Sequence, residues 1–465
     1  MSVQLRTPSP PLCLGLSSRP GKPSVPTKTG RDSTVDLIRA LCLLVVVALH
    51  TMMAGVERTS DGGLLTSVAL AGTDSFIPVS WFIQVMPLFF IAGGFASLTQ
   101  WRRMRARGAS WQHYVISRTQ RLAVPAVVLF GVVGVVLVMA GGSGLDAGLV
   151  AEVRLRVGQP LWFLAVYLGV TALVPFMARW HEKRPGGTVA ALGLGVVAVD
   201  AARFVLDTPA LGLFNLALVW LLMQQLGFLF HDGAAARWPR GRLYVGLAVS
   251  LLTLFAVVTW GPYSADMLVN LNPPTAAIVL LGSAQFFALR LLKPRLDASR
   301  VAASIGATIS ARAMTIYLWH MPVVLGLVFV LWTLGFPLPE PHSGSWWATR
   351  LPWLLAVAAV LFAVVPVLDR VERRLAQRLN SGAAQGAVVR ANLLGVPTRD
   401  FHRMQGPGAV LTVVMAIAGV VLMLTQALPL VPTALVSVGL LAGSVLVGRM
   451  LDRVPSHPFG EPHVS

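Results

Sequence analysis

Charged residues are scarce in this chain. Asp, Glu, Lys and Arg make up 12% of its 465 residues, about half the share found in soluble domains. Acidic residues are the scarcer kind, because 19 Asp and Glu stand against 37 Lys and Arg and leave a formal net charge of +18. Hydrophobic residues reach 55%. This depletion of charge excludes an ordinary soluble domain and indicates a protein that crosses a membrane many times.

Cysteine is almost absent, with Cys13 and Cys42 as the only two. Neither a disulfide framework nor a cysteine-based zinc site is expected from this number. No two histidines have the spacing of an HExxH motif, so the sequence predicts no metal. The excess of basic residues would suggest a nucleic-acid partner in a soluble protein. Here the basic residues fall in short loops between apolar runs, which is how membrane topology is encoded, and no nucleic acid is expected.

Twelve apolar runs are long enough to cross a bilayer, whose hydrocarbon core takes about 20 helical residues. The predicted fold is therefore an all-α polytopic transmembrane helix bundle of about 12 spans. The expected spans are 35–54, 77–98, 121–140, 160–178, 188–206, 211–230, 243–260, 273–292, 312–335, 351–368, 409–427 and 430–449.

Basic residues alternate from loop to loop. Basic stretches such as "WRRMRARG", "RWHEKR" and "DRVERR" follow every second span. On the other side, Asp266 is the only charged residue in the loop 261–272. The positive-inside rule then predicts a multi-pass protein of the cell membrane with both termini in the cytoplasm.

The composition also divides the chain into segments. Residues 1–33 are rich in Pro, Ser and Thr without periodicity and are expected to form a disordered cytoplasmic tail. Residues 34–371 hold ten spans. The polar, basic stretch 372–407 is expected to be a cytoplasmic linker, 408–450 holds two additional transmembrane helices, and 451–465 is a cytoplasmic tail.

The first span carries three ionisable residues, Asp36, Arg39 and His50. Placing such a group in hydrocarbon costs free energy, on the order of 3 kcal/mol per residue at the centre of a helix, unless the group is paired or faces a wet cavity. Arg39 and His50 fall within about 20° of one helix face and about 16 Å apart along the axis, and Asp36 can pair with Arg39 at i, i+3. The face either lines a polar passage, or Arg39 reaches the inner headgroups and His50 is interfacial.

The segment "DLIRALCLLVVVALH" resembles the first helix of the integral-membrane acyltransferase family 3, in which an arginine is followed eleven positions later by a histidine. Four more stretches resemble family segments in the same order: "MPLFFIAGGF" (86–95), "RTQRLAVP" (118–125), "LWFLAVYL" (161–168) and "TIYLWHMPV" (315–323). There are two departures. Gly93 stands where the family has a serine, and the last two spans lie outside the usual ten-helix unit.

This resemblance implies a membrane-bound O-acyltransferase. Such an enzyme moves an acyl group, commonly acetyl, from cytoplasmic acyl-CoA to a hydroxyl of an envelope carbohydrate, glycolipid or secreted metabolite. His50 would act with Arg39 in catalysis, because an alcohol needs a base and a histidine can titrate near neutral pH. His50 could instead accept the acyl group as a relay. The base role needs only one transfer step and is the preferred hypothesis.

Further polar and aromatic residues are candidates for binding. Arg118 and Arg121 share a helix face and could bind the donor's phosphates, although a plain positive-inside cluster would look the same. A substrate cavity is expected to be lined by Asp36, Trp162, Tyr317 and His320. Structural alternatives are an interhelical hydrogen bond for His320 and a place in the aromatic belt for Trp162.

Two other functions stay open. A secondary transporter or exporter without acyl-transfer chemistry would also have about twelve spans, but it should show repeat symmetry between its halves, and none is visible. A non-catalytic scaffold would not need Arg39 and His50 on one face.

In the fifth span, Asp200 and Arg203 could form a structural ion pair or a polar wall of the acceptor cavity.

Overall fold

The computed structural model describes residues 32–58, 64–70, 73–233, 238–394, 398–425 and 429–452. The chain separates into two units, residues 1–32 and 33–465, and every described helix and strand belongs to the second. Nearly all of the predicted N-terminal tail, and residues 453–465 of the predicted C-terminal tail, lie outside the described residues.

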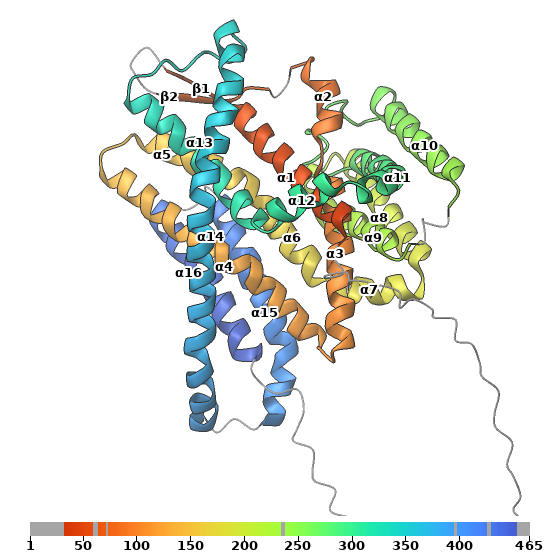
Figure 1. Ribbon diagram of the computed structural model, residues 1–465, viewed down its shortest axis with the longest axis vertical. Coiled ribbons are helices and arrows are strands. Elements are labelled where there is room, and N and C mark those ends of the chain that lie inside the picture. The colour runs from red at the N-terminus through yellow and green to blue at the C-terminus, as the bar shows by residue number, and fades with distance from the viewer. Residues whose placement is uncertain are drawn as a thin grey trace, which may run out of the picture. The chain divides into compact units, whose positions relative to one another are not determined.

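Helices make up most of the described chain (Figure 1). Their bounds are α1 (Ser33–Met53), α2 (Phe76–Ile83), α3 (Met86–Ala106), α4 (Trp111–Gly142), α5 (Ala147–Gly158), α6 (Trp162–Ala172), α7 (Val174–Lys183), α8 (Pro185–Val205), α9 (Asn215–His231), α10 (Arg240–Thr259), α11 (Ala276–Asp297), α12 (Arg300–Ser310), α13 (Ala313–Thr333), α14 (Gly344–Leu394), α15 (Thr398–Leu424) and α16 (Leu430–Asp452). Two 3-10 turns, η1 (Gln159–Leu161) and η2 (Pro209–Phe214), precede α6 and α9.

The predicted all-α polytopic bundle of about twelve spans is confirmed. Among the described residues, eleven segments are long and apolar enough to cross a membrane, and the bent segment Ala147–Lys183 can serve as a twelfth. Each of the twelve runs found in the sequence overlaps one of these segments. The two short strands were not predicted. They are β1 (Ala54–Arg58) and β2 (Leu64–Val68), an antiparallel pair with Ala54 opposite Val68.

Proline accounts for breaks in two spans. The second span is divided into α2 and α3, and Pro87 occupies the first turn of α3. The fourth span bends by 52° between α6 and α7, and Pro175 occupies the first turn of α7. Proline lacks an amide hydrogen and its ring clashes with the preceding turn, which favours a break or a kink. The effect depends on the surroundings, because α4, α13 and α14 continue through proline residues.

The stretch expected to be a linker, 372–407, is helical over most of its length. Residues 372–394 continue α14 and residues 398–407 begin α15. The two C-terminal helices then pack on α4, and α15 also packs on α6 (Figure 1). The Ser444 hydroxyl donates to the carbonyl of Thr412 at 2.7 Å, and the Arg154 guanidinium of α5 donates to the carbonyl of Thr425. The C-terminal pair thus belongs to the same helical bundle as the preceding ten spans.

Glycine allows α3 and α9 to approach until their backbones touch. A Cβ added at Gly227 would lie 2.2 Å from the carbonyl oxygen of Ile91, and one at Gly94 would lie 2.4 Å from that of Gln224. Small residues at such crossings are the usual means of close packing between membrane helices. The crossing holds Phe90 of α3 against Trp220 of α9, with ring centroids 4.4 Å apart.

Asp200 ties several segments together. Its carboxylate lies 3.5 Å from Arg203 Nε and accepts hydrogen bonds from Asn215 Nδ2, the Tyr263 hydroxyl and the Ala276 amide, at 3.0, 3.0 and 2.8 Å. Burial and the Asp200 carboxylate together raise the pKa of Tyr263, so that the phenol stays a donor. With this many partners, Asp200 has the surroundings of a structural tie between α8, α9 and α11 rather than of a cavity wall.

Candidate active site

The structure brings the two intramembrane histidines together. His50 is in the last turn of α1, and His320 is in α13, 270 residues later. His50 Nδ1 lies 2.9 Å from His320 Nε2, and the two rings stack with centroids 5.1 Å apart and an interplanar angle of 25°. His320 has no exposed surface, whereas His50 is partly exposed. The sequence had singled out both residues without relating one to the other.

The hydrogen bonds assign a tautomer to each ring. His320 Nδ1 lies 2.6 Å from the carbonyl oxygen of Tyr317, which can only accept, so Nδ1 carries the proton. In a neutral imidazole the other nitrogen is then an acceptor. His320 Nε2 therefore accepts from His50 Nδ1, and His50 is left with an unprotonated Nε2. That nitrogen is suited to take a proton from a substrate hydroxyl.

Tyr317 acts through its backbone in this arrangement. Its carbonyl receives the proton of His320, and its hydroxyl donates to the carbonyl of Pro160 at 2.6 Å. Its ring packs edge-on against Phe163, with centroids 5.3 Å apart. Tyr317 thus joins α13 to η1 and α6 and fixes the position of His320 relative to them. The proton of its hydroxyl is already engaged in the hydrogen bond to Pro160.

Trp162 lies in an aromatic cluster at the start of α6. Its ring centroid is 6.3 Å from that of Trp220 and 6.4 Å from that of Phe163. Within the described part of the chain, it makes no ring contact with His50 or His320. Phe163, which contacts both Trp162 and Tyr317, is the residue that connects this cluster to the histidine pair.

A second polar group consists of Arg39 of α1 and Arg118 of α4. Arg39 and Arg118 are both partly buried, and Arg118 lies within electrostatic range of Arg39, Arg121, Tyr114 and Tyr167. Arg39 Nε and two nitrogens of Arg118, Nε and Nη2, are buried without a hydrogen-bond partner among the described residues. Unpaired buried guanidinium groups are costly. The group therefore has the chemistry of an anion site.

Arg121 differs from Arg118 although both stand on α4. Its side chain is exposed, whereas Arg118 turns inward with its Cζ 5.8 Å from the centroid of the Tyr114 ring. The sequence paired the two arginines by spacing, and the structure adds Arg39 from another helix. Asp36 is partly buried, and its carbonyl accepts from the Ser310 hydroxyl at 2.9 Å. A pairing of Asp36 with Arg39 stays a prediction.

Tyr167 is a residue that the sequence argument missed. A Cβ added at Gly93 would lie 3.6 Å from the Tyr167 hydroxyl oxygen. The hydroxyl of Tyr167 thus stands beside the position where the resembled family has a serine. The only signal in the sequence was the phenol itself, one turn after Phe163 in "LWFLAVYL", and nothing local relates that phenol to Gly93 on another helix.

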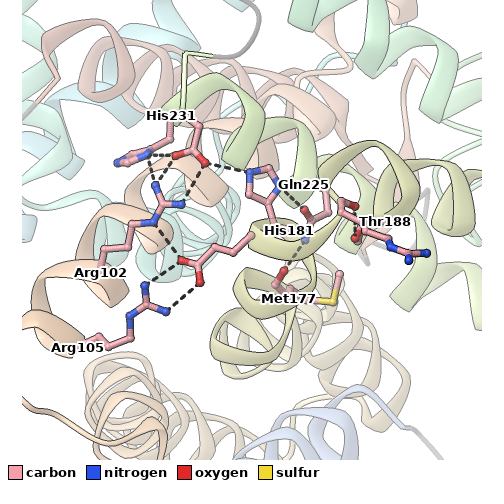
Figure 2. Close-up of polar contacts among 10 residues, drawn as sticks. Arg102, Arg105, Met177, His181, Thr188, Gln225 and His231 are labelled. Atoms are coloured by element: carbon pink, nitrogen blue, oxygen red, sulfur yellow. Dashed lines mark hydrogen bonds and ion pairs between the residues drawn. The ribbon is translucent and has the colours of Figure 1, made fainter.

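Charged side chains also link the ends of α3, α7 and α9 (Figure 2). Arg102 pairs with Asp232 and lies 3.5 Å from Glu182, and Arg105 donates to Glu182 at 3.0 and 2.9 Å. Burial opposes the ionisation of Asp232, but hydrogen bonds from Arg102 and His231 outweigh it and lower the pKa of Asp232 to about 2. The pairs hold the helix ends together on the side where α1 begins.

His181 belongs to the same network. Its Nδ1 lies 2.9 Å from Gln225 Oε1 and its Nε2 lies 3.2 Å from Asp232 Oδ2, while the Gln225 amide donates to the Met177 carbonyl (Figure 2). The sequence predicted no role for His181 or His231. Their contacts make them part of the connection between helices.

The comparisons with known proteins identify the family of the chain and leave the roles of these residues untested. A family model described as an acyltransferase domain, of the acyltransferase 3 type, matches residues 32–369. This range holds the histidine pair and the Arg39–Arg118 group. No match was found among curated proteins or among solved structures. On the extent of the family match, the chain belongs to the acyltransferase 3 family of membrane proteins.

Proposed function

We propose that the protein transfers an acyl group, acetyl in the simplest case, from cytoplasmic acyl-CoA to a hydroxyl of an envelope carbohydrate, glycolipid or secreted metabolite. The side on which α1 begins is then the cytoplasmic side, and the protein is a multi-pass enzyme of the cell membrane. The observation that carries this proposal is the hydrogen-bonded pair of His50 and His320, which leaves a basic nitrogen on His50.

The reaction follows from the assigned tautomers. His50 Nε2 takes the proton of the acceptor hydroxyl as its oxygen attacks the thioester carbonyl. The tetrahedral intermediate collapses with cleavage of the carbon–sulfur bond, and the thiolate leaving group takes the proton back from His50. While His50 is protonated, the Nε2 lone pair of His320 accepts a hydrogen bond from the imidazolium. His320 thus positions the base and stabilises its charged form.

The donor would be held at the other end of α1. Its phosphates suit the unpaired guanidinium nitrogens of Arg39 and Arg118, because arginine binds phosphate through paired, charge-assisted hydrogen bonds. Arg39 precedes His50 by about 16 Å along the helix axis. The arm of the donor, which separates its phosphates from its thioester, would follow this helix face towards His50.

The test is a transfer assay in inverted membrane vesicles supplied with labelled acetyl-CoA. Label is expected on a lipid-linked or sugar product, and His50→Ala is expected to abolish it, with a loss of about 10²- to 10⁴-fold for removal of a general base. His113→Ala, at an exposed histidine of α4, is the matched control and should transfer normally. Transfer that persists in His50→Ala at normal expression would contradict the proposed role.

A transporter is the second candidate. The divided second span and the bent fourth span support it, since broken helices form the substrate sites of many carriers. The same vesicles distinguish the two functions. Passage of a substrate without any labelled product would favour a carrier, and it would leave the histidine pair without a chemical role.

A further inference from the structure

A pocket of about 310 Å³ lies where the adjacent ends of α3 and α4 meet α7. Its lining residues are Trp101, Arg105, Trp111, Pro175, Phe176 and Arg179. Trp111 and Phe176 contact each other with ring centroids 5.4 Å apart. The walls are thus mainly aromatic and apolar and carry two guanidinium groups. This combination suits an amphiphile with an anionic head.

The two arginines of the pocket differ in their charge balance. Arg105 is held by Glu182 through two hydrogen bonds of 3.0 and 2.9 Å, which neutralises it. Arg179 is exposed and forms no ion pair within the described part of the chain. The pocket therefore has one uncompensated positive charge, and that charge belongs to α7.

The ends of the spans indicate that the pocket is at the depth of lipid headgroups. Trp101 and Arg105 are in the last turns of a span that ends at Ala106, and Trp111 begins the next span. On α7, Phe176 and Trp180 are 40% and 60% exposed. Tryptophan is enriched where membrane helices meet the headgroups. Basic pockets between helix ends are typical sites for acidic lipid heads.

The pocket is separate from the proposed donor site. Neither Arg39 nor Arg118 is among the residues that line it. Tyr114, which has no exposed surface, packs near both sites, with its ring centroid 5.4 Å from that of Trp101 and 5.8 Å from Arg118 Cζ. Its occupant is therefore expected to come from the bilayer rather than to be the nucleotide end of the donor.

We propose that this pocket binds an anionic phospholipid of the leaflet on the side where α1 begins. Its phosphate lies at Arg179, and its glycerol and upper acyl carbons lie against Trp111 and Phe176. The proposal does not depend on acyl transfer, because it rests on residues outside the histidine pair and outside the Arg39–Arg118 group.

The test compares lipid binding to purified full-length protein by native mass spectrometry after delipidation and titration with phosphatidylglycerol or phosphatidylcholine. Arg179→Ala is expected to weaken saturable phosphatidylglycerol binding about fivefold, the effect of about 1 kcal/mol for one basic residue near the headgroups. Phe176→Ala should weaken it as well. The matched controls are Arg184→Ala and Trp180→Ala, which alter exposed residues at the same end of the molecule but outside the pocket lining.

Equal losses in Arg179→Ala and Arg184→Ala would overturn the proposal, because they would indicate diffuse attraction to headgroups. Displacement of the bound lipid by inorganic phosphate or by adenosine diphosphate would overturn it too, since the pocket would then bind a soluble phosphate. Thermal unfolding of each variant is the control for folding. Should Phe176→Ala misfold, Arg179→Ala still decides the outcome, because that side chain is exposed and its removal leaves no cavity.

Discussion

Replacing His320 tests whether the histidine pair works as a unit. His320→Leu introduces an apolar side chain of similar length. It removes the acceptor nitrogen that lies 2.9 Å from His50 Nδ1. The imidazolium formed during transfer then loses one hydrogen bond to a charged group, worth about 1.5–3 kcal/mol. We therefore expect kcat to fall about 10- to 150-fold. His320→Gln should recover part of this loss, because its amide oxygen can accept from the same proton.

The assay is transfer of labelled acetyl groups in inverted vesicles at saturating acetyl-CoA, normalised to the amount of protein. The Michaelis constant for acetyl-CoA should change little, since His320 contacts His50, which lies about 16 Å along the helix axis from Arg39. Unfolding midpoints of the Leu and Gln variants provide the control for packing around a residue with no exposed surface. Wild-type turnover in a folded His320→Leu protein would refute the reasoning, because His50 would then need no partner.

Three further outcomes follow from the structure. Arg118→Ala should raise the Michaelis constant for acyl-CoA about 10- to 100-fold through loss of a charge-assisted contact, whereas Arg121→Ala, at an exposed residue, should change it much less. The pKa of Asp232 is lowered to about 2 from an ordinary 3.8. Its carboxylate should therefore stabilise the fold above about pH 4, and this stabilisation should be lost as the pH falls through about 2. The unfolding midpoint of Asp232→Asn should accordingly depend less on pH in that window than the midpoint of the wild type. Gly227→Ala should lower the unfolding midpoint because the added carbon has no room at the α3–α9 crossing, whereas Gly193→Ala, with nothing within 4 Å of its added carbon, should not.

The spans could be predicted from the sequence because their signal is local. A run of about 20 apolar residues forms a helix across the bilayer whatever its neighbours are. Arg39 and His50 were found in the same way, since eleven residues on one helix fix their relative position. Composition alone did not predict the length of α14. The stretch 372–407 is polar and basic, yet α14 continues into it as far as Leu394, because polar residues can also form a helix.

Contacts between distant helices were not predictable in this way. The pairing of His50 with His320 depends on which of the helices lie side by side, and neither residue carries that information. The proximity of Tyr167 to Gly93 depends on helix packing for the same reason. Nothing in the position of His181 in the sequence indicates its partner Asp232, because the two meet only where α7 packs on α9. Each of these contacts is fixed by tertiary packing rather than by spacing.

The family-matched part of the chain ends at residue 369, yet α15 and α16 return to cover α4. The outer wall that the enzyme presents to the lipid is thus built in part by helices that the shared unit does not supply. Relatives that share the matched unit but lack this hairpin would expose a bare flank of α4 to the acyl chains. An appended pair of helices can in this way change the lipid surroundings or the neighbours of such a protein and leave its histidine pair unchanged.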